Sequence, residues 1–163
     1  MIKRRLLKPK EIRERLRCYI DDELGDALAL KLVEAGSEFS MPANLREHLP
    51  AVFVRLDNWS SSHATKLGVR QTAFQFEVLY LRALADGEEA QEKLIDPAAD
   101  LDELFARDDY TWPFLLDEPD GYRVVSALAS DAQFPDPTDL DELDIRLESC
   151  SLAVTVTVET QPQ

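Results

Sequence analysis

The C-terminal stretch 143–160, LDIRLESCSLAVTVTVET, decides the fold. Its apolar side chains stand at odd positions up to Leu147 and at even positions from Cys150 to Val158, which is the alternation of a β-strand whose buried face changes once. We expect either a one-residue β-bulge near 148–149 or a division into two strands, because both exchange the two faces. A continuous strand of this length would span roughly 55–60 Å, so it either bends or reaches beyond its own domain.

The face of this strand that turns away from the predicted core carries an uncharged row. Its members are Ser149, Ser151, Ala153, Thr155 and Thr157. A flat, uncharged row at the edge of a sheet favours pairing with another chain. The row therefore predicts an inter-subunit edge at Ser149, Ser151, Thr155 and Thr157, and the alternative is an interior strand beside a helix.

Two more strands are predicted upstream of this one. Residues 50–56, PAVFVRL, are apolar in both phases, which is typical of a strand buried on both faces. Residues 69–81 alternate between apolar and polar side chains, as a half-buried antiparallel strand does. The polar stretch between them, DNWSSSHATKL at 57–67, predicts a long hairpin loop.

This loop is a candidate contact region, because loops of its length are often functional. Taken from Asn58 to Arg70, it contains one tryptophan and two basic side chains in an otherwise acidic protein. The candidate contact residues are Asn58, Trp59, Lys66 and Arg70.

Helical segments are expected before and after these strands. Residues 9–33 repeat apolar side chains at helical spacing, and Gly25 weakens the middle by about 1 kcal/mol relative to alanine, so a bend or break is expected there. Residues 88–105 form a second helical region, in which Asp96 is expected to cap a piece that begins with Pro97. A third strand is predicted at 122–129, and an acidic loop at 131–142.

The predicted fold class is therefore α+β, with a small mixed, mainly antiparallel sheet of about four strands flanked by two or three helices. A chain of 163 residues, 45% of them apolar, is long enough for one substantial core, so we expect a single domain over 1–163. Residues 1–8 are expected to be a flexible basic arm. No apolar stretch approaches the ~20 residues of a membrane helix, so no membrane partner is expected. Cys18 and Cys150 are interpreted as reduced thiols.

The net charge of −14 is unevenly distributed along the chain. Residues 1–17 carry eight basic and two acidic side chains, and the remaining ten basic and thirty acidic side chains give the rest a charge of −20. A body this acidic repels phosphates, so specific binding of nucleic acid is not expected.

No pattern of catalytic or ligating residues is found. Ser60–Ser62 and His63 are adjacent, but the nucleophile-elbow motif G-x-S-x-G is absent. The two histidines lack metal-ligand spacing, and the acidic run 136–144 does not fit a calcium loop. With five glycines and no phosphate-binding pattern, a nucleotide loop is not indicated either. We therefore expect no catalytic residue, no metal and no cofactor.

Four stretches in a fixed order resemble the tail terminator (tail completion) proteins of long-tailed bacteriophages. They are PAVFVRLDNW at 50–59, AFQFEVLYLRA at 73–83, LIDPAADLDELFA at 94–106 and SCSLAVTVTVET at 149–160. The resemblance extends over 9–160 and rests on the order and texture of the elements. The chain carries a larger acidic insertion at 107–142, where the correspondence is open.

The resemblance implies a non-catalytic virion protein that assembles in the host cytoplasm. Such a protein forms a homo-oligomeric ring, a hexamer in this family, that caps the tail tube protein and meets the neck or stopper protein, while DNA passes through without specific binding. The contact loop and the outer row of the last strand are then the expected contact surfaces. The candidates for an acidic channel lining are Asp100, Asp102, Glu103, Asp108 and Asp109, although these residues could equally serve solubility alone.

Other functions remain open at this level. A stopper or adaptor ring of the phage neck would share this size and style of fold. An acidic inhibitor that mimics DNA would be an elongated monomer with regularly spaced carboxylates. An enzyme is the third class, and a cleft of perturbed carboxylates would indicate it.

Overall fold

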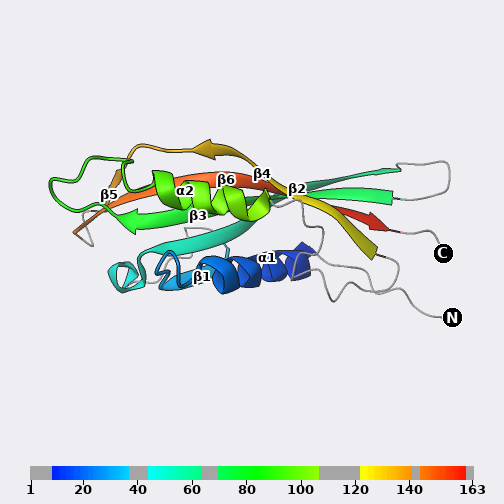
Figure 1. Cartoon of the computed structure of the whole chain (residues 1–163), viewed down its shortest axis with the longest axis horizontal. Coiled ribbons are helices and arrows are strands. Elements are labelled where there is room, and N and C mark those ends of the chain that lie inside the picture. Colours follow the sequence, from blue (N-terminus) through cyan, green and yellow to red (C-terminus); the bar gives the residue numbers. More distant parts are fainter. Residues whose placement is uncertain (1–8, 37–43, 64–69, 107–121, 141–143, 161–163) are drawn as a thin grey trace.

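The computed structural model describes residues 9–36, 44–63, 70–106, 122–140 and 144–160, and shows an α+β fold (Figure 1). In chain order the elements are α1 (Pro9–Leu24), β1 (Leu32–Ala35), the 3-10 turn η2 (Leu45–His48), β2 (Ala51–His63), β3 (Arg70–Ala83), α2 (Ile95–Phe105), β4 (Tyr122–Gln133), β5 (Thr138–Leu140) and β6 (Ile145–Thr160). The expected class is confirmed, but the sheet has six strands instead of about four. The additional strands β1 and β5 have four and three residues, which is too short for a readable alternation.

The strand order is β1-β2-β3-β6-β4, with β5 paired to the start of β6. β1 runs parallel to β2, and all other neighbours are antiparallel. The last strand of the chain therefore lies inside the sheet, where β3 pairs with it on one side and β4 and β5 pair with it on the other.

Both α-helices cover the same face of the sheet. Their apolar side chains join one hydrophobic cluster with even-numbered residues of β2, β3 and β6, such as Val54, Phe76 and Val154. α1 packs toward β1 and β2, α2 packs toward β4 and β6, and the rings of Tyr19 and Phe105 meet with centroids 6.2 Å apart.

A second, smaller hydrophobic cluster lies on the opposite face, at one end of the sheet. It joins the η2 region with odd-numbered strand residues, and its buried members are Leu45, Leu49, Ala51, Phe53, Leu79, Leu81, Ile145 and Leu147. This cluster explains the change of phase in the last strand without any bulge. The pairing of β6 with β3 is regular from Leu147 to Thr160, so the predicted bulge at 148–149 is wrong. The strand remains regular, and its buried side chains pack in the second cluster up to Leu147 and under the helices from Cys150.

The polar stretch after residue 56 is a strand, so the predicted hairpin loop at 57–67 is wrong for its first part. β2 continues to His63 and pairs with β3, after a register shift between Leu56 and Asn58 that leaves Asp57 as a bulge. The resulting hairpin extends past the helices at one end of the molecule (Figure 1). The polar residues after Leu56 form a strand because they pair with β3, where Trp59 lies opposite Phe74. Composition alone does not show such cross-strand contacts, so it predicted a loop.

The two predicted helices are shorter than expected. α1 ends at Leu24, because the following Gly25 turns so tightly that a Cβ atom would lie 2.4 Å from the carbonyl oxygen of Asp21. Most of the segment predicted as the end of this helix forms turns, and its last two residues, Leu32 and Val33, begin β1. α2 begins at Ile95 with Leu94 as its N-cap, so Asp96 lies in the first turn and is not the cap. A carboxylate in the first turn still interacts favourably with the positive end of the helix dipole.

The pairing divides the sheet into two parts. We call the part built on β3 residues 78–83 the proximal half, and the part built on β3 residues 70–77 the distal half. The second hydrophobic cluster lies in the proximal half only. The predicted basic arm at 1–8 and much of the acidic insertion, at 107–121, lie outside the described residues.

Candidate interaction surface

The distal half has one face under the helices and one face that neither described hydrophobic cluster includes. The pairing aligns side chains across all four strands on this second face, which we call the open face. One row consists of Asn58, Gln75, Thr155 and Leu128, and the next consists of Ser60, Ala73, Thr157 and Ser126. All eight side chains are uncharged, and Leu128 is the only large apolar side chain among them.

Charged groups frame the open face at both ends and are paired with neighbours on it. Toward the proximal half, Arg55 contacts Glu77 at 3.1 Å and Asp57 at 3.3 Å. Toward the hairpin tip, the Gln71 amide donates to Glu159 over 2.9 Å. The uncharged rows therefore form a band between two charged rows, and a flat uncharged band between charges is suited to contact with another protein.

The predicted inter-subunit row on β6 does not lie at a sheet edge. β6 has strand partners on both sides, so the alternative of an interior strand is confirmed and the edge prediction is wrong. Ser149 and Ser151 are half-buried in the proximal half, whereas Thr155 and Thr157 lie on the open face. Burial alternation alone does not distinguish an edge strand from a central one, which is why the sequence misplaced this row.

Asn58 and Trp59 of the predicted contact loop lie on β2, and Arg70 begins β3, while Lys66 lies outside the described residues. Asn58 donates to Gln75 at 3.3 Å, and Arg70 donates to the Ser61 hydroxyl at 3.0 Å. Trp59 points to the helix side of the sheet, where its ring lies 6.4 Å from that of Phe74 and its side chain stays 56% exposed. Strand alternation therefore places Asn58 and Trp59 on opposite faces.

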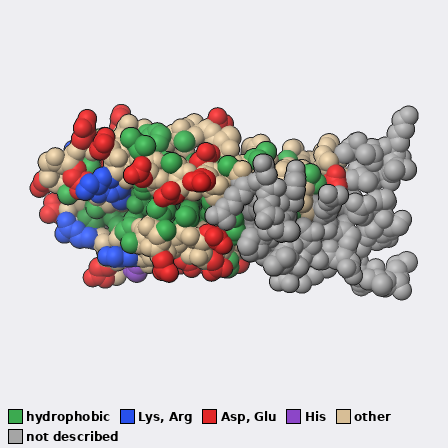
Figure 2. All heavy atoms as spheres, viewed as in Figure 1, with side chains coloured by type: hydrophobic (Ala, Val, Ile, Leu, Met, Phe, Trp, Pro, Cys, Tyr) green, Lys and Arg blue, Asp and Glu red, His purple; other side chains and the backbone are tan. Residues whose placement is uncertain are grey.

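The acidic candidates on α2 are exposed. Asp100, Asp102 and Glu103 lie outside the helix face that buries Leu101 and Leu104, and Asp108 and Asp109 lie outside the described residues. Figure 2 shows acidic side chains spread over the described part of one face, whereas Lys and Arg gather at the end away from the hairpin. On this face the acidic groups do not form one separate patch.

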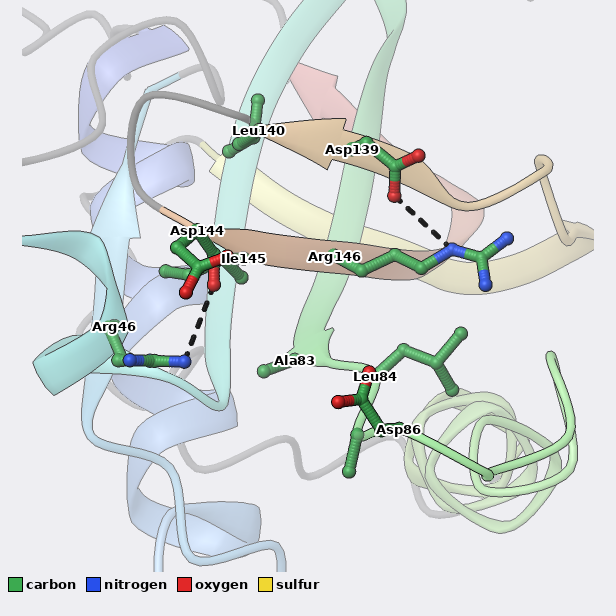
Figure 3. A pocket seen from close by; sticks show the side chains of 10 residues that line it. Arg46, Ala83, Leu84, Asp86, Asp139, Leu140, Asp144, Ile145 and Arg146 are labelled. Atoms are coloured by element: carbon green, nitrogen blue, oxygen red, sulfur yellow. Dashed lines mark hydrogen bonds and ion pairs between the residues drawn. The ribbon is translucent and has the colours of Figure 1, made fainter.

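A pocket of about 550 Å³ lies in the proximal half, where β3 ends and β6 begins (Figure 3). Arg46 donates to the Asp144 carbonyl oxygen at 3.4 Å, and Arg146 forms an ion pair with Asp139 at 3.3 Å. The described lining contains no serine, cysteine or histidine. The Arg146–Asp139 pair ties β5 to β6, and the Arg46 hydrogen bond ties η2 to the residue before β6.

One carboxylate is buried, and the sequence gave no indication of it. Glu148 is 1% exposed, and its two oxygens accept hydrogen bonds from Arg82 and from the backbone N–H of Gln91. Arg82 also donates to Glu88 at 3.0 Å, and this hydrogen bond lowers the pKa of Glu88 below its usual value. The network fastens the turn before α2 onto β6, which is a structural role.

The two cysteines are free, as predicted. Burial raises the pKa of Cys150 to about 12, and burial is also the main reason that the pKa of Cys18 is raised. Thiols with raised pKa values are poor nucleophiles at neutral pH. Within the described residues no group of His, Cys, Asp and Glu side chains has the arrangement of a metal site. The two described α-helices, α1 and α2, fall short of the length and apolar character needed to cross a bilayer.

Comparison of the sequence with known protein families finds no match, and comparison with curated proteins finds none either. Solved structures do share the fold. A chain in the structure of the virion of a native gene transfer agent particle matches with a TM-score of 0.50 and 12% identity, over 91% of this chain and 93% of that chain. A second solved chain, whose name states no function, matches with a TM-score of 0.47 and 18% identity, over 97% and 99% of the two chains.

Proposed function

We propose that this chain is a non-catalytic structural protein of a phage virion, which forms a ring on the end of the tail tube and joins it to the neck. The observation that carries the proposal is the fold, because a chain of a gene transfer agent virion shares it over nine-tenths of both chains. The order of sequence elements supports the same assignment independently, since it resembles the tail terminator proteins.

The distal half is the part of the molecule that suits contact with the tube. Its hairpin extends past the helices, and it carries Asn58, Arg70 and the largely exposed Trp59. Exposed tryptophan and arginine are the side chains that most often supply binding energy at protein interfaces. We therefore assign tube or neck contact to this end, together with Lys66, which lies between β2 and β3 in the sequence.

The acidic surface fits a protein past which DNA moves. Asp100, Asp102 and Glu103 lie exposed on α2, and Asp108 and Asp109 follow it in the sequence. Such groups repel phosphates within about 8–10 Å at physiological salt, and they also keep a virion precursor soluble. On either account they act without binding DNA.

A tube-length assay tests the proposal. The purified chain is added to tail tube protein during polymerisation, and the tubes are measured by electron microscopy with the chain labelled. We expect elongation to stop and the label to appear at one end of each tube. The Trp59→Ser variant should cap more weakly, and Ile95→Ser, at another exposed apolar position on α2, serves as its control.

The other outcomes assign the chain differently. Label at the neck without any effect on tube length would indicate a stopper or adaptor ring. Unlabelled tubes of unchanged length, together with a chain that remains monomeric and binds a nuclease, would replace the proposal with the DNA-mimic function.

A further inference from the structure

Two strands of the distal half have a partner on one side only among the described residues. β1 pairs with β2 only as far as Val54, so Arg55–His63 pairs with β3 alone. On the other side of the sheet, residues 126–130 of β4 have β6 as their only strand partner in the described part of the chain. A strand edge exposes a row of backbone N–H and C=O groups that can bind another strand. The distal half therefore has a free edge on each side.

Both free edges contain a short, regular and uncharged segment. On β2 this is Asn58–Ser62, NWSSS, which starts directly after the bulge at Asp57. On β4 it is Ser126–Ser130, SALAS, which lies between two register shifts. Proteins usually protect edges with lysine, proline or bulges. The bulge at Asp57 precedes the first segment and the two register shifts bracket the second, so neither segment itself contains a bulge, a lysine or a proline.

The two segments are also level with each other across the sheet. Asn58 stands in the same row as Leu128, and Ser60 in the same row as Ser126. Three successive antiparallel contacts separate β2 from β4, so the two strands run in opposite directions. Copies placed side by side around an axis along the strands would bring the β2 edge of one copy to the β4 edge of the next as an antiparallel pair.

We propose that copies of this chain assemble by pairing residues 58–60 of one copy antiparallel with residues 126–128 of the next, so that Asn58 faces Leu128 and Ser60 faces Ser126; this inference rests on the ring in the proposed function. Pairing β2 with β4 occupies both free edges of every copy and continues around a ring. A two-fold pairing of β2 with β2 would leave both β4 edges exposed. The contact also accounts for Leu128, which is 60% exposed and would be covered by the row of Asn58 on the neighbour.

This pairing assigns the two faces of the sheet to the two sides of the ring. The face that carries α1 and α2 is the bulkier one, so it lies outside, and the open face turns toward the axis. Ala73, Gln75 and Thr155 would then line the inner wall, while Asp100 and Asp102 of α2 would lie on the outer surface. Of the two roles proposed for these carboxylates, this arrangement favours solubility over repulsion of DNA in the channel. The two uncharged rows would form a band around the inner wall, to which DNA phosphates do not adhere.

Mixed cysteine cross-linking tests the pairing. Two variants in a Cys18→Ser background, Ser60→Cys and Ser126→Cys, are prepared separately, mixed, and treated with a short bis-maleimide that tolerates a shift of one residue pair. We expect a cross-linked product in the mixture and none in either variant alone. Ser151→Cys, on the interior strand β6, replaces Ser126→Cys in the control mixture and should give no product.

A charge variant tests the same contact without cross-linking. Leu128→Lys places a charge on the β4 edge without disturbing the core, and native mass spectrometry should show at least a tenfold loss of the ring. The pairing would be overturned if Ser60→Cys cross-links to itself, or if the wild-type chain forms rings but the two cysteine variants give no mixed product. Either result would leave the tail-capping function standing. If the cysteine variants give the mixed product but the wild-type chain does not cap tubes, the function would be overturned and the pairing would stand.

Discussion

The proximal and distal halves of the sheet are built on the same three strands, β2, β3 and β6, but they bury their side chains differently. In the proximal half a hydrophobic cluster lies on each face, so Leu79 and Leu81 are as buried as Val78 and Tyr80. In the distal half only the helix side is packed. Strand pairing is therefore common to both halves. They differ in whether a hydrophobic cluster covers the face opposite the helices, which it does in the proximal half only.

The ion pairs of the two halves show the same contrast. Arg82 and Glu148 are both largely shielded from water in the proximal half, whereas Arg55 and Glu77 remain more than a quarter exposed in the distal half. Removing one member of a buried pair leaves an uncompensated charge, whereas exposed pairs contribute little.

The largest effect is expected when the buried pair is broken. Arg82→Met should lower the free energy of unfolding by about 3–5 kcal/mol, because the Glu148 carboxylate then retains only the Gln91 N–H. Arg55→Met is the matched change in the distal half and should cost less than about 1 kcal/mol. Urea unfolding measures both, and equal losses in the two variants would remove the distinction between the halves.

A slightly smaller effect is expected from the second hydrophobic cluster. Leu147→Ala opens a cavity between β6 and the η2 region and should cost about 2–5 kcal/mol. Leu128→Ala removes the same side chain from the open face and should change stability by no more than about 0.5 kcal/mol. A loss below about 1 kcal/mol for Leu147→Ala, measured by the same method, would mean that the second cluster contributes little.

The sequence was sufficient to predict the α+β class and the positions of β3, β4 and β6, because their alternation directly reflects burial. It also located the change of face near Glu148. It could not assign a cause to this change, since the η2 segment that covers Leu81 and Leu147 is distant in sequence and has no pattern of its own. A bulge and a second hydrophobic cluster give the same pattern of apolar and polar residues along the strand. Only contacts between residues distant in sequence distinguish the two.

The candidate site was predicted less well than the fold. Asn58, Trp59 and Thr155 lie outside the buried core, but the open face that relates Asn58 to Thr155 depends on strand order. Strand order is a property of pairing between distant segments. For the same reason the free edges were assigned to β6, while the structure places them on β2 and β4.

A modest effect is expected from the aromatic pair of the hairpin. Trp59→Ser removes the ring that packs at a tilt beside Phe74 and should cost about 1 kcal/mol, because the indole is already more than half exposed. Thermal unfolding measures this loss, with Asn58→Ser on the other face as the control. A loss as large as that of Leu147→Ala would mean that the distal half is packed as firmly as the proximal half.

The smallest effect is a difference in pH dependence. The Arg82 hydrogen bond holds the pKa of Glu88 below its unfolded value, so its contribution is present above the unfolded pKa and is lost as pH falls through the lower folded pKa. Between about pH 5 and about pH 3, the free energy of unfolding should fall less steeply for Glu88→Gln than for the wild type. Glu89→Gln, at the exposed neighbouring position, controls for the lost charge. Parallel pH curves for wild type and Glu88→Gln would show that this hydrogen bond does not contribute.

The unbroken course of β6 through both halves has a mechanical consequence. Its 16 residues span roughly 53 Å, and β3 is bonded to it along almost the whole length without a bulge. This pair of strands has no bulge at which a twist applied at the hairpin end could be absorbed. The twist should therefore reach the turn held by Glu148 and the pocket beside Arg146, so that docking at one end of the molecule is felt at the other as a tilt of the entire sheet.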